Sequence, residues 1–279
     1  MAIASRKTGV VLMLDIKNVT CGYGKEIILA NIDFNVNPGD IISIMGANGI
    51  GKTTLFKSIL GHLKLIKGSI LIDGKDINTL SSREKAKLIA YVPQAHIPPF
   101  PFKVIDVVTM GRTAHISTFS SPTKKDMQIA KESLDKVNIL YLQNKTYTEI
   151  SGGERQLVLI ARALAQKSEI LIMDEPTANL DFGNQIRILE QINNLARNGL
   201  AIIYTTHFPD HTFLCSNQVL VIKGKDDYVF GVADKIITSE LLKELYHVNA
   251  EVKEIMLTHE IVRVCIPISS PTRGDCYET

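Results

Sequence analysis

Short hydrophobic runs and longer amphipathic stretches alternate along most of this chain. Near the N-terminus single apolar residues alternate with polar ones, and continuous apolar runs follow further on; these are the patterns of half-buried and fully buried strands. Strands are therefore predicted at Leu14–Ile16, Ile32–Val36, Ile41–Met45, Glu169–Met173 and Ala201–Thr205. Because helical patterns separate the later strands, we predict a parallel sheet covered by helices.

Apolar residues at helical spacing predict helices over Thr53–Leu63, Val104–Met110, Lys124–Val137 and Asn184–Arg197. Residues 97–102 include three prolines, which remove hydrogen-bond donors and fix φ, so this segment is predicted to be irregular. We interpret the region that it opens as an inserted, mostly helical subdomain. Two alternating stretches between Ala250 and Ile268 predict a hairpin near the C-terminus.

These patterns divide the chain into four parts. We predict a loose leader over residues 1–11, with Met13 as an alternative start, and a core over residues 12–94 and 161–252. The helical subdomain occupies residues 95–160, and residues 253–279 form a short C-terminal extension. A chain of 279 residues with 45% apolar content is long enough to bury a core of this size.

Composition narrows the classes of partner. The net charge is +2, from 31 basic and 29 acidic side chains, so no overall field attracts nucleic acid or a membrane surface, and we expect no nucleic acid partner. The apolar run Val10–Leu14 is too short for a signal peptide or a membrane span. The cysteines lack Cys-x-x-Cys spacing and are interpreted as reduced thiols of an intracellular protein. They are Cys21, Cys215, Cys265 and Cys276.

A glycine-rich segment follows the predicted strand at Ile41–Met45. Residues 46–53 fit the pattern G-x-x-x-x-G-K-[ST], in which backbone N–H groups cradle phosphate oxygens. Lys52 should reach the β- and γ-phosphates of a nucleotide, and the Thr53 hydroxyl should ligate Mg²⁺. The order strand, loop, helix is the context that such a loop requires, which disfavours the alternative of a lysine in a surface turn. The predicted nucleotide-binding residues of this segment are Gly46, Asn48, Gly49, Gly51, Lys52, Thr53 and Thr54.

Two carboxylates come directly after the apolar strand at Glu169–Met173. Asp174 should therefore emerge at the carboxyl edge of the sheet, beside the phosphate-binding loop, and hold Mg²⁺ through water. The adjacent Glu175 is the best candidate for the base that polarises the attacking water. Two solvated carboxylates at a strand end are the alternative, and the glycine-rich loop favours the functional interpretation.

A second glycine-rich segment, Ser151-Gly152-Gly153-Glu154, opens an amphipathic pattern typical of a helix. The S-x-x-E spacing predicts a capping box, which by itself is a sufficient structural explanation. Two glycines in a first turn cost helix stability, so they need a further reason. Bare N–H groups at a helix N-terminus can bind an anion, and one nucleotide cannot easily use both ends of one subunit. A second copy of the chain must therefore be considered.

Together and in this order, these segments resemble the ATP-binding cassette (ABC) family, from about Leu14 to Val252. The signature of that family is usually L-S-G-G-Q, and residues 150–154 depart from it at both ends. Ile150 preserves an apolar anchor. Glu154 puts an anion near the expected γ-phosphate, and the capping-box geometry would turn this carboxylate away.

The resemblance assigns roles to further residues. Tyr23 matches the aromatic residue that stacks on adenine, and Gln94 matches the glutamine that touches Mg²⁺ and water and links the core to the helical insert. His207 matches the switch histidine that contacts the γ-phosphate, and Ala178–Asp181 resembles the loop that crosses to the partner subunit. Taken alone, Tyr23 would be read as packing and His207 as a satisfied histidine at a strand end.

The resemblance also implies a fold, cofactors and an assembly. The fold is an α/β P-loop NTPase (RecA-like) core with an N-terminal antiparallel β-subdomain and an inserted helical subdomain. The cofactors are ATP and Mg²⁺. Two cassettes are expected to form a homodimer, in which each ATP lies between the P-loop of one copy and Ser151, Gly152 and Gly153 of the other.

One cassette without a visible membrane span resembles the separate ATPase subunit of an importer. Residues 107–122 and 241–252 look like the importers of iron–siderophores, haem and cobalamin, and related members take up molybdate or tungstate. The resemblance implies docking on a polytopic permease through Pro98–Arg112, an indirect substrate-binding protein, and a location at the cytoplasmic face of the membrane. A non-transport ABC ATPase in DNA repair or translation, and a kinase-like P-loop enzyme, remain the alternatives.

Overall fold

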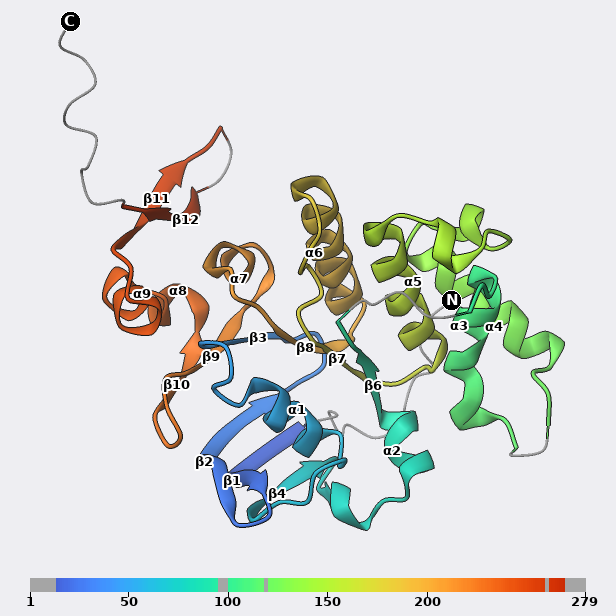
Figure 1. Ribbon diagram of the computed structural model, residues 1–279, viewed down its shortest axis with the longest axis horizontal. Coiled ribbons are helices and arrows are strands. Elements are labelled where there is room, and N and C mark those ends of the chain that lie inside the picture. The colour runs from blue at the N-terminus through green and yellow to red at the C-terminus, as the bar shows by residue number, and fades with distance from the viewer. Residues whose placement is uncertain (1–13, 95–99, 118–119, 259–260, 269–279) are drawn as a thin grey trace, which may run out of the picture.

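A mostly parallel sheet forms the centre of the molecule in the computed structural model, which describes residues 14–94, 100–117, 120–258 and 261–268 (Figure 1). In the described part of the chain its strand order is β10-β9-β3-β8-β7-β6, and only β10 is antiparallel to its neighbour. The strands are β10 (Tyr228–Val232), β9 (Gln218–Ile222), β3 (Ile41–Met45), β8 (Ala201–Thr205), β7 (Ile170–Met173) and β6 (Ile89–Val92). The predicted parallel sheet is confirmed.

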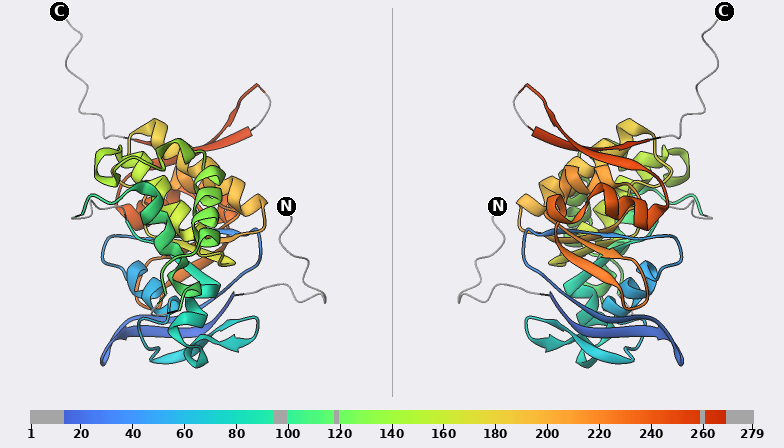
Figure 2. Two further views of the ribbon diagram at one scale, coloured as in Figure 1. Left: turned by 90° about the vertical axis from the view of Figure 1, so that its right-hand side faces the viewer. Right: turned by 90° about the vertical axis from the view of Figure 1, so that its left-hand side faces the viewer.

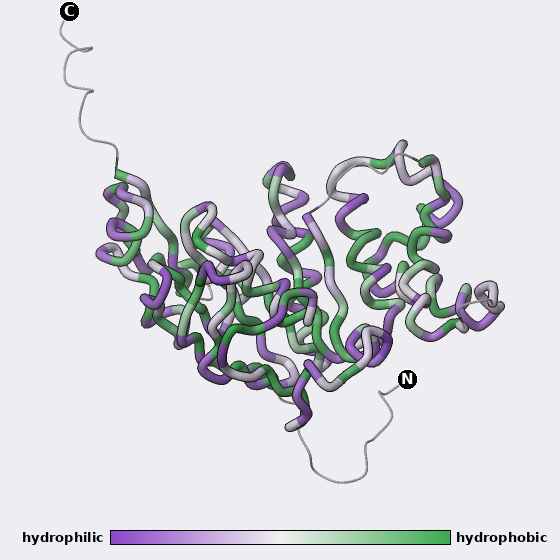
Figure 3. Tube along the Cα trace, turned by 60° about the horizontal axis from the view of Figure 1, so that its bottom comes forward, coloured by the Kyte–Doolittle hydropathy of each residue, from purple (hydrophilic) through white to green (hydrophobic). Residues whose placement is uncertain are grey.

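Alternate side chains of the central strands join two different hydrophobic cores. Ile170 and Ile172 of β7 pack into the core on one face, whereas Leu171 and Met173 pack into the core on the other. Successive side chains of a strand point to opposite faces, so a continuous apolar run is what a sheet covered on both sides needs. Figure 3 shows hydrophobic stretches (green) alternating with hydrophilic ones (purple) along the helices that cover the sheet.

One face of the central sheet is covered by α1 (Lys52–Ile59), which also packs against a second, antiparallel sheet (Figure 1). That sheet has the order β2-β1-β4-β5 and is the predicted N-terminal β-subdomain. Its strands are β1 (Leu14–Tyr23), β2 (Glu26–Val36), β4 (Lys67–Ile72) and β5 (Lys75–Asp76). The short helix α2 (Ser82–Leu88) then leads into β6.

The other face is covered by helices from both the insert and the core. They are α3 (Val104–Thr109), α4 (Lys124–Lys136), α5 (Gly152–Ala165), α6 (Phe182–Arg197) and α7 (Pro209–Cys215). The helical character of the insert is confirmed. The Arg112 guanidinium, in the 3-10 turn after α3, donates to Asp126 at 3.0 Å and to the Ala165 carbonyl at 2.7 Å, and both charged side chains are buried. Hydrogen bonds from Thr123 and then from Arg112 lower the pKa of Asp126 to about 2, so this carboxylate stays ionised.

The chain ends in α8 (Ala233–Ile236), α9 (Ser239–Tyr246) and the hairpin of β11 (Ala250–Met256) and β12 (Ile261–Pro267). The predicted terminal hairpin is therefore confirmed. Figure 2 shows this hairpin at one end of the molecule and the antiparallel β-subdomain at the other.

One predicted helix ends earlier in the structure than the sequence pattern indicates. The helix predicted over Thr53–Leu63 ends at Ile59, because Gly61 adopts a left-handed φ of 67° and breaks the helical path. The division of the chain into parts stays a prediction. Helix α5 runs without a break across residues 160 and 161, and β11 runs across residues 252 and 253.

Some predictions fall wholly or partly outside the described residues. They concern the leader, Met13, the prolines at positions 98 and 99, Cys276 and residues 269–279. Cys21, Cys215 and Cys265 are free thiols. Over the ranges that the structure covers, no helix combines the length and apolar character that crossing a bilayer requires.

Candidate nucleotide-binding and hydrolytic site

The glycine-rich segment forms a loop between the C-terminal end of β3 and the N-terminus of α1, as predicted. Gly46, Gly49 and Gly51 have φ values of 153°, 77° and 117°, which side chains rarely adopt. At Gly51 a Cβ would lie 2.7 Å from Ile28 Cγ2, so that position also lacks space for one. The conformation turns the chain sharply into α1, whose free N–H groups and dipole favour a bound anion.

Lys52 is the first residue of α1, and its side chain folds back over the loop. Its Nζ donates to the Gly46 carbonyl at 2.7 Å and to the Ala47 carbonyl at 3.0 Å. Burial lowers the pKa of Lys52, while the negative charges of Glu175 and Asp174 oppose that shift. A cation is thus held at the mouth of the loop, close enough to feel the charges of Glu175, the predicted base, and Asp174, the predicted Mg²⁺ ligand.

Asp174 and Glu175 lie at the carboxyl edge of the central sheet, directly after β7. Asp174 N–H donates to the Val92 carbonyl of β6, and Thr205 at the end of β8 donates to Asp174 Oδ1 at 2.8 Å. Three neighbouring strands therefore fix this carboxylate at the edge where open α/β sheets bind ligands. The predicted position of Asp174 is confirmed.

Sequence reasoning missed two residues that hold Asp174 in place. Thr205 is fully buried, and its hydroxyl also accepts the Glu175 N–H at 2.8 Å. Tyr91 donates to Asp174 Oδ2 at 3.4 Å, and burial together with Asp174 raises its pKa to about 12, which keeps the phenol protonated. Both residues lie close to predicted ones in the sequence: Thr205 is two positions before His207, and Tyr91 is three positions before Gln94. Their contacts with Asp174, however, depend on the register of the strands.

Glu175 faces His207 across the gap between the ends of β7 and β8. A hydrogen bond joins Glu175 Oε1 and His207 Nε2, and both side chains are partly exposed. Glu175 has a left-handed φ of 46°, unusual for a residue with a side chain, and its N–H bond to Thr205 holds it there. A carboxylate presented to solvent beside an imidazole can accept a proton from a water molecule.

Glu175 and His207 line one cleft with the loop that follows β7. Its other lining residues are Thr177, Ala178, Asn179, Thr206 and Phe208. Two residues beyond this lining, Asp181 caps α6 by accepting the Asn184 N–H at 2.8 Å. Asp181 is exposed, so the loop is open to a partner.

Tyr23 and Gln94 occupy the flanks of the phosphate-binding loop and the carboxylates. Tyr23 ends β1 and is 47% exposed, and its hydroxyl accepts a hydrogen bond from Lys57 of α1 at 3.4 Å. Its ring is thus held beside α1, with the Lys57 ammonium 5.8 Å from the ring centre, and about half of the side chain stays exposed. Gln94 is exposed two residues after β6, the strand next to β7.

The Ser151 segment begins α5 with the predicted capping box. Ser151 Oγ accepts the Glu154 N–H at 3.2 Å, and Glu154 Oε2 accepts the Ser151 N–H at 2.8 Å. Tyr141 donates to the other oxygen, Oε1, at 3.3 Å. Both oxygens of this carboxylate are therefore engaged, which is consistent with its turning away from the first-turn N–H groups of Gly152 and Gly153.

A single chain does not bring its two glycine-rich segments together. The phosphate-binding loop leads into α1 on one face of the central sheet, whereas α5 lies on the other (Figure 1). A Cβ at Gly153 would lie 2.4 Å from Asn184 of α6, so close packing of α5 against α6 explains this glycine without a ligand. Gly152 has room for a Cβ and lacks that explanation.

The donors near the loop fit Mg²⁺ in chemistry. Thr53 is exposed, Asp174 is a partly exposed carboxylate, and Gln94 offers an amide oxygen. Mg²⁺ keeps several waters and is usually held by one or two carboxylates together with substrate phosphates, not by a cage of protein ligands. In agreement, no cluster of three or more His, Cys, Asp or Glu side chains suited to a metal occurs within the described ranges.

Replacing Thr205 with valine should disturb both carboxylates at once. Valine has nearly the same shape but leaves the buried Glu175 N–H unpaired and removes a donor from Asp174, which costs roughly 1–3 kcal/mol of stability. We expect a lower melting temperature and slower ATP hydrolysis at limiting Mg²⁺. Thr205→Ser keeps the hydroxyl and should remain close to wild type. Wild-type behaviour of Thr205→Val, or a loss in Thr205→Ser as large as that in Thr205→Val, would contradict this role of the hydroxyl.

The family model described as ABC transporter matches residues 29–178, more than half of the chain. The chain belongs to the ABC transporter family. Proteins of this family hydrolyse ATP, so this cassette is an ATPase. It is similar to the molybdate import ATP-binding protein of Haemophilus influenzae, with 36% identity over 253 residues, 88% of this chain and 94% of that protein.

Two further similarities extend over nearly the whole cassette. An iron chelatin transport ATP-binding protein of Helicobacter pylori is 36% identical over 242 residues, 86% of this chain and 95% of that protein. A solved structure described as an inward-facing metal-chelate type ABC transporter aligns with a TM-score of 0.83 and 33% identity, covering 92% of this chain and 98% of that chain. The expected α/β cassette fold is thereby confirmed.

Proposed function

We propose that this cassette is the ATP-hydrolysing subunit of an importer for a metal chelate of the iron–siderophore, haem or cobalamin type. The observation that carries the proposal is that one chain begins two helices, α1 and α5, with glycine-rich segments on opposite faces of its central sheet. Each ATP would therefore lie between two copies, and hydrolysis would be tied to closing and opening of the pair.

We assign the residues of one half-site as follows. The loop N–H groups and Lys52 bind the phosphates, and Tyr23 stacks on the adenine. Mg²⁺, held by Thr53, Gln94 and Asp174, supplies neutralisation of phosphate charge. Glu175 accepts the proton of the attacking water, and His207 orients Glu175 through their hydrogen bond.

The second half-site consists of the N-terminal turn of α5. The capping box leaves the N–H groups of Gly152 and Gly153 for the γ-phosphate of the nucleotide on the partner copy. The loop that ends at Asp181 crosses to that partner. A complete site then needs two chains, which makes hydrolysis depend on pairing.

The permease is proposed to dock on the exposed part of the segment before and along α3. Phe100 and Phe102 contact each other and are largely exposed, and Met110 is exposed at the end of the helix. Arg112 belonged to the segment that we expected to dock, but it is buried against Asp126 and faces the helical insert. The docking surface is therefore defined as Phe100, Phe102 and Met110. This contact would hold the cassette at the cytoplasmic face of the membrane.

The nature of the cargo is supported by similarity alone. The printed names of the relatives include iron chelatin and molybdate transport, and the structural neighbour is of the metal-chelate type. Molybdate is the second candidate, because that relative is as similar in identity as the iron one. Neither class is contacted by the cassette, because selection belongs to the permease and its binding protein.

Expression with a tag in native membranes should test the role. We expect the cassette to co-purify with a polytopic membrane protein, and the reconstituted complex to release more phosphate when a binding protein carries its cargo. Iron chelates, haem, cobalamin and molybdate are compared as cargo. Phe102→Asp should abolish co-purification without changing the melting temperature. Ile66→Asp, at a side chain of similar exposure between α1 and β4 and outside this surface, should leave co-purification intact. Co-purification with ribosomes or DNA instead would reverse the assignment.

A further inference from the structure

The terminal hairpin has one covered face and one uncovered face. Cross-strand partners share a face, so Val252 with Cys265 and Glu254 with Arg263 lie on one side. Val252 and Cys265 pack against the small core that α9 helps to form. At this end the inner face is therefore part of the folded body of the molecule, whereas the next apolar pair on it, Met256 with Ile261, is exposed.

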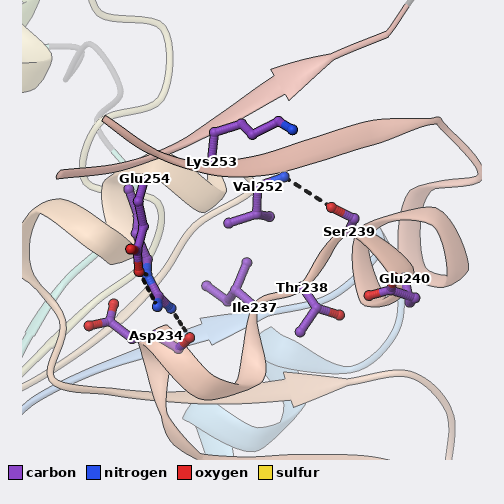
Figure 4. A pocket seen from close by; sticks show the side chains of 9 residues that line it. Asp234, Ile237, Thr238, Ser239, Glu240, Val252, Lys253 and Glu254 are labelled. Atoms are coloured by element: carbon purple, nitrogen blue, oxygen red, sulfur yellow. Dashed lines mark hydrogen bonds and ion pairs between the residues drawn. The ribbon is translucent and has the colours of Figure 1, made fainter. Parts of the chain in front are cut away.

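Polar contacts fasten the inner face in place (Figure 4). Val252 N–H donates to Ser239 Oγ at 3.0 Å, and Arg263 binds Glu254 at 2.6 Å and also the Asp234 carbonyl. On the neighbouring helix α7, Asp210 Oδ1 accepts the Cys265 N–H at 2.7 Å. The hairpin is thus held firmly against α7, α8 and α9.

The outer face is apolar and exposed. The pairs Lys253 with Val264 and Ile255 with Val262 alternate with the inner pairs and therefore point the other way. On this outer face, continued by one residue beyond the end of each strand, four large aliphatic side chains are at least 40% exposed. They are Ile255, Leu257, Ile266 and Ile268. We call these four residues the hairpin patch; a gathering of this kind on one small sheet marks an interaction surface.

A two-stranded hairpin is only marginally stable when nothing covers it. Residues 269–279 are an unsuitable cover, because this stretch contains no Ile, Leu, Val, Met or Phe. The proposed permease surface lies elsewhere. Figure 1 places β11 and β12 at one side of the molecule and α3 with α4 at the opposite side, so the hairpin patch is separate from the surface of Phe100, Phe102 and Met110.

We infer that the hairpin patch binds the same patch of a second copy of this chain. Two observations support this occupant. First, the hairpin is bonded to Asp210, only three residues after His207, whose cleft lies at the face that a second copy is proposed to complete. Second, the outer face carries Glu251 and Lys253, which form an ion pair at 2.7 Å. In a two-fold contact between two copies, Glu251 of each copy can then pair with Lys253 of the other.

This inference rests on the proposed function in one respect: the hairpin is placed beside the proposed ATP-dependent interface. The hairpin contact does not involve nucleotide, so it would keep two cassettes together after hydrolysis opens the ATP sites. The two ATP sites could then close again within the same dimer, without two separate cassettes having to meet by diffusion.

Sedimentation velocity of the purified chain without nucleotide tests the inference. We expect a dimer when the protein concentration is raised to about 100 μM, because even a weak contact is populated there. Ile255→Glu with Ile266→Glu should weaken this dimer at least tenfold. The matched control is Ile66→Glu, an aliphatic residue of similar exposure located between α1 and β4, at the opposite end of the molecule from the hairpin (Figure 2). It should not change the dimer.

Adding Glu175→Gln to the double variant separates this inference from the proposed function. Without nucleotide this triple variant should be monomeric, and ATP with Mg²⁺ should restore a dimer through the nucleotide sites, which also shows that it is folded. A monomeric wild type without nucleotide, an unchanged double variant, or an equal effect of Ile66→Glu would each overturn the hairpin contact. Failure of ATP to restore the dimer would instead contradict the proposed ATP-bound pair.

Discussion

Replacing Glu175 with glutamine should lower the rate of ATP hydrolysis roughly 10²-fold or more, the usual contribution of a positioned general base. Glutamine keeps the shape of the side chain and can still bond His207, but it cannot accept a proton from water. Binding of ATP should be retained. We therefore expect the variant to hold ATP through gel filtration, measured as nucleotide eluting with the protein, while phosphate release nearly stops.

His207→Ala is the informative companion to this variant. Because it leaves the carboxylate in place and removes only the residue that orients it, the loss should be smaller than that of Glu175→Gln. The assignment of Glu175 as the base would be wrong if Glu175→Gln turned over ATP at a rate near that of the wild type. A larger loss for His207→Ala would move the central role to the histidine.

Lys52→Ala should abolish tight ATP binding. In the structure the ammonium group occupies the mouth of the loop, held by the Gly46 and Ala47 carbonyls and within reach of the charges of Asp174 and Glu175. Without that cation, the triphosphate would approach two carboxylates with only Mg²⁺ to offset their charge. We expect hydrolysis to fall roughly 10²–10³-fold, as when one preorganised electrostatic contact is removed.

Isothermal titration with ATP should separate binding from chemistry in this variant. Lys52→Arg is the matched control for charge, and it should also fail, because the planar guanidinium cannot take the place of a compact ammonium between two carbonyls. Unchanged ATP affinity in Lys52→Ala would contradict the proposed phosphate site.

Where a motif depends on local backbone chemistry, sequence and structure agree. Gly46, Gly49 and Gly51 adopt left-handed φ values that the G-x-x-x-x-G spacing already indicates, and the capping box of Ser151 and Glu154 needs only one helical turn. The apolar run of β7 places Asp174 at the strand end for the same reason. Each of these features is fixed within a few residues.

The pattern of hydrophobic and polar residues did not predict contacts between segments that are distant in the sequence. Thr205 meets Asp174 because Met173 pairs with Tyr204 across two parallel strands, and no local feature of the sequence sets that register. The burial of Arg112 has the same origin, since its partners Asp126 and Ala165 come from other helices. Residues that support the site are therefore harder to predict than residues that form it.

The sequence by itself determined that this chain is an α/β cassette with a phosphate-binding loop, two carboxylates at a strand end and a second glycine-rich helix start. Only the tertiary structure decided which side chains hold those carboxylates, that Arg112 is buried, and that the hairpin patch is exposed. The physical reason is the distance along the chain over which each feature is determined. Glycine conformations, caps and strand alternation are set by neighbours in the chain, whereas burial and long-range hydrogen bonds depend on how strands and helices pack.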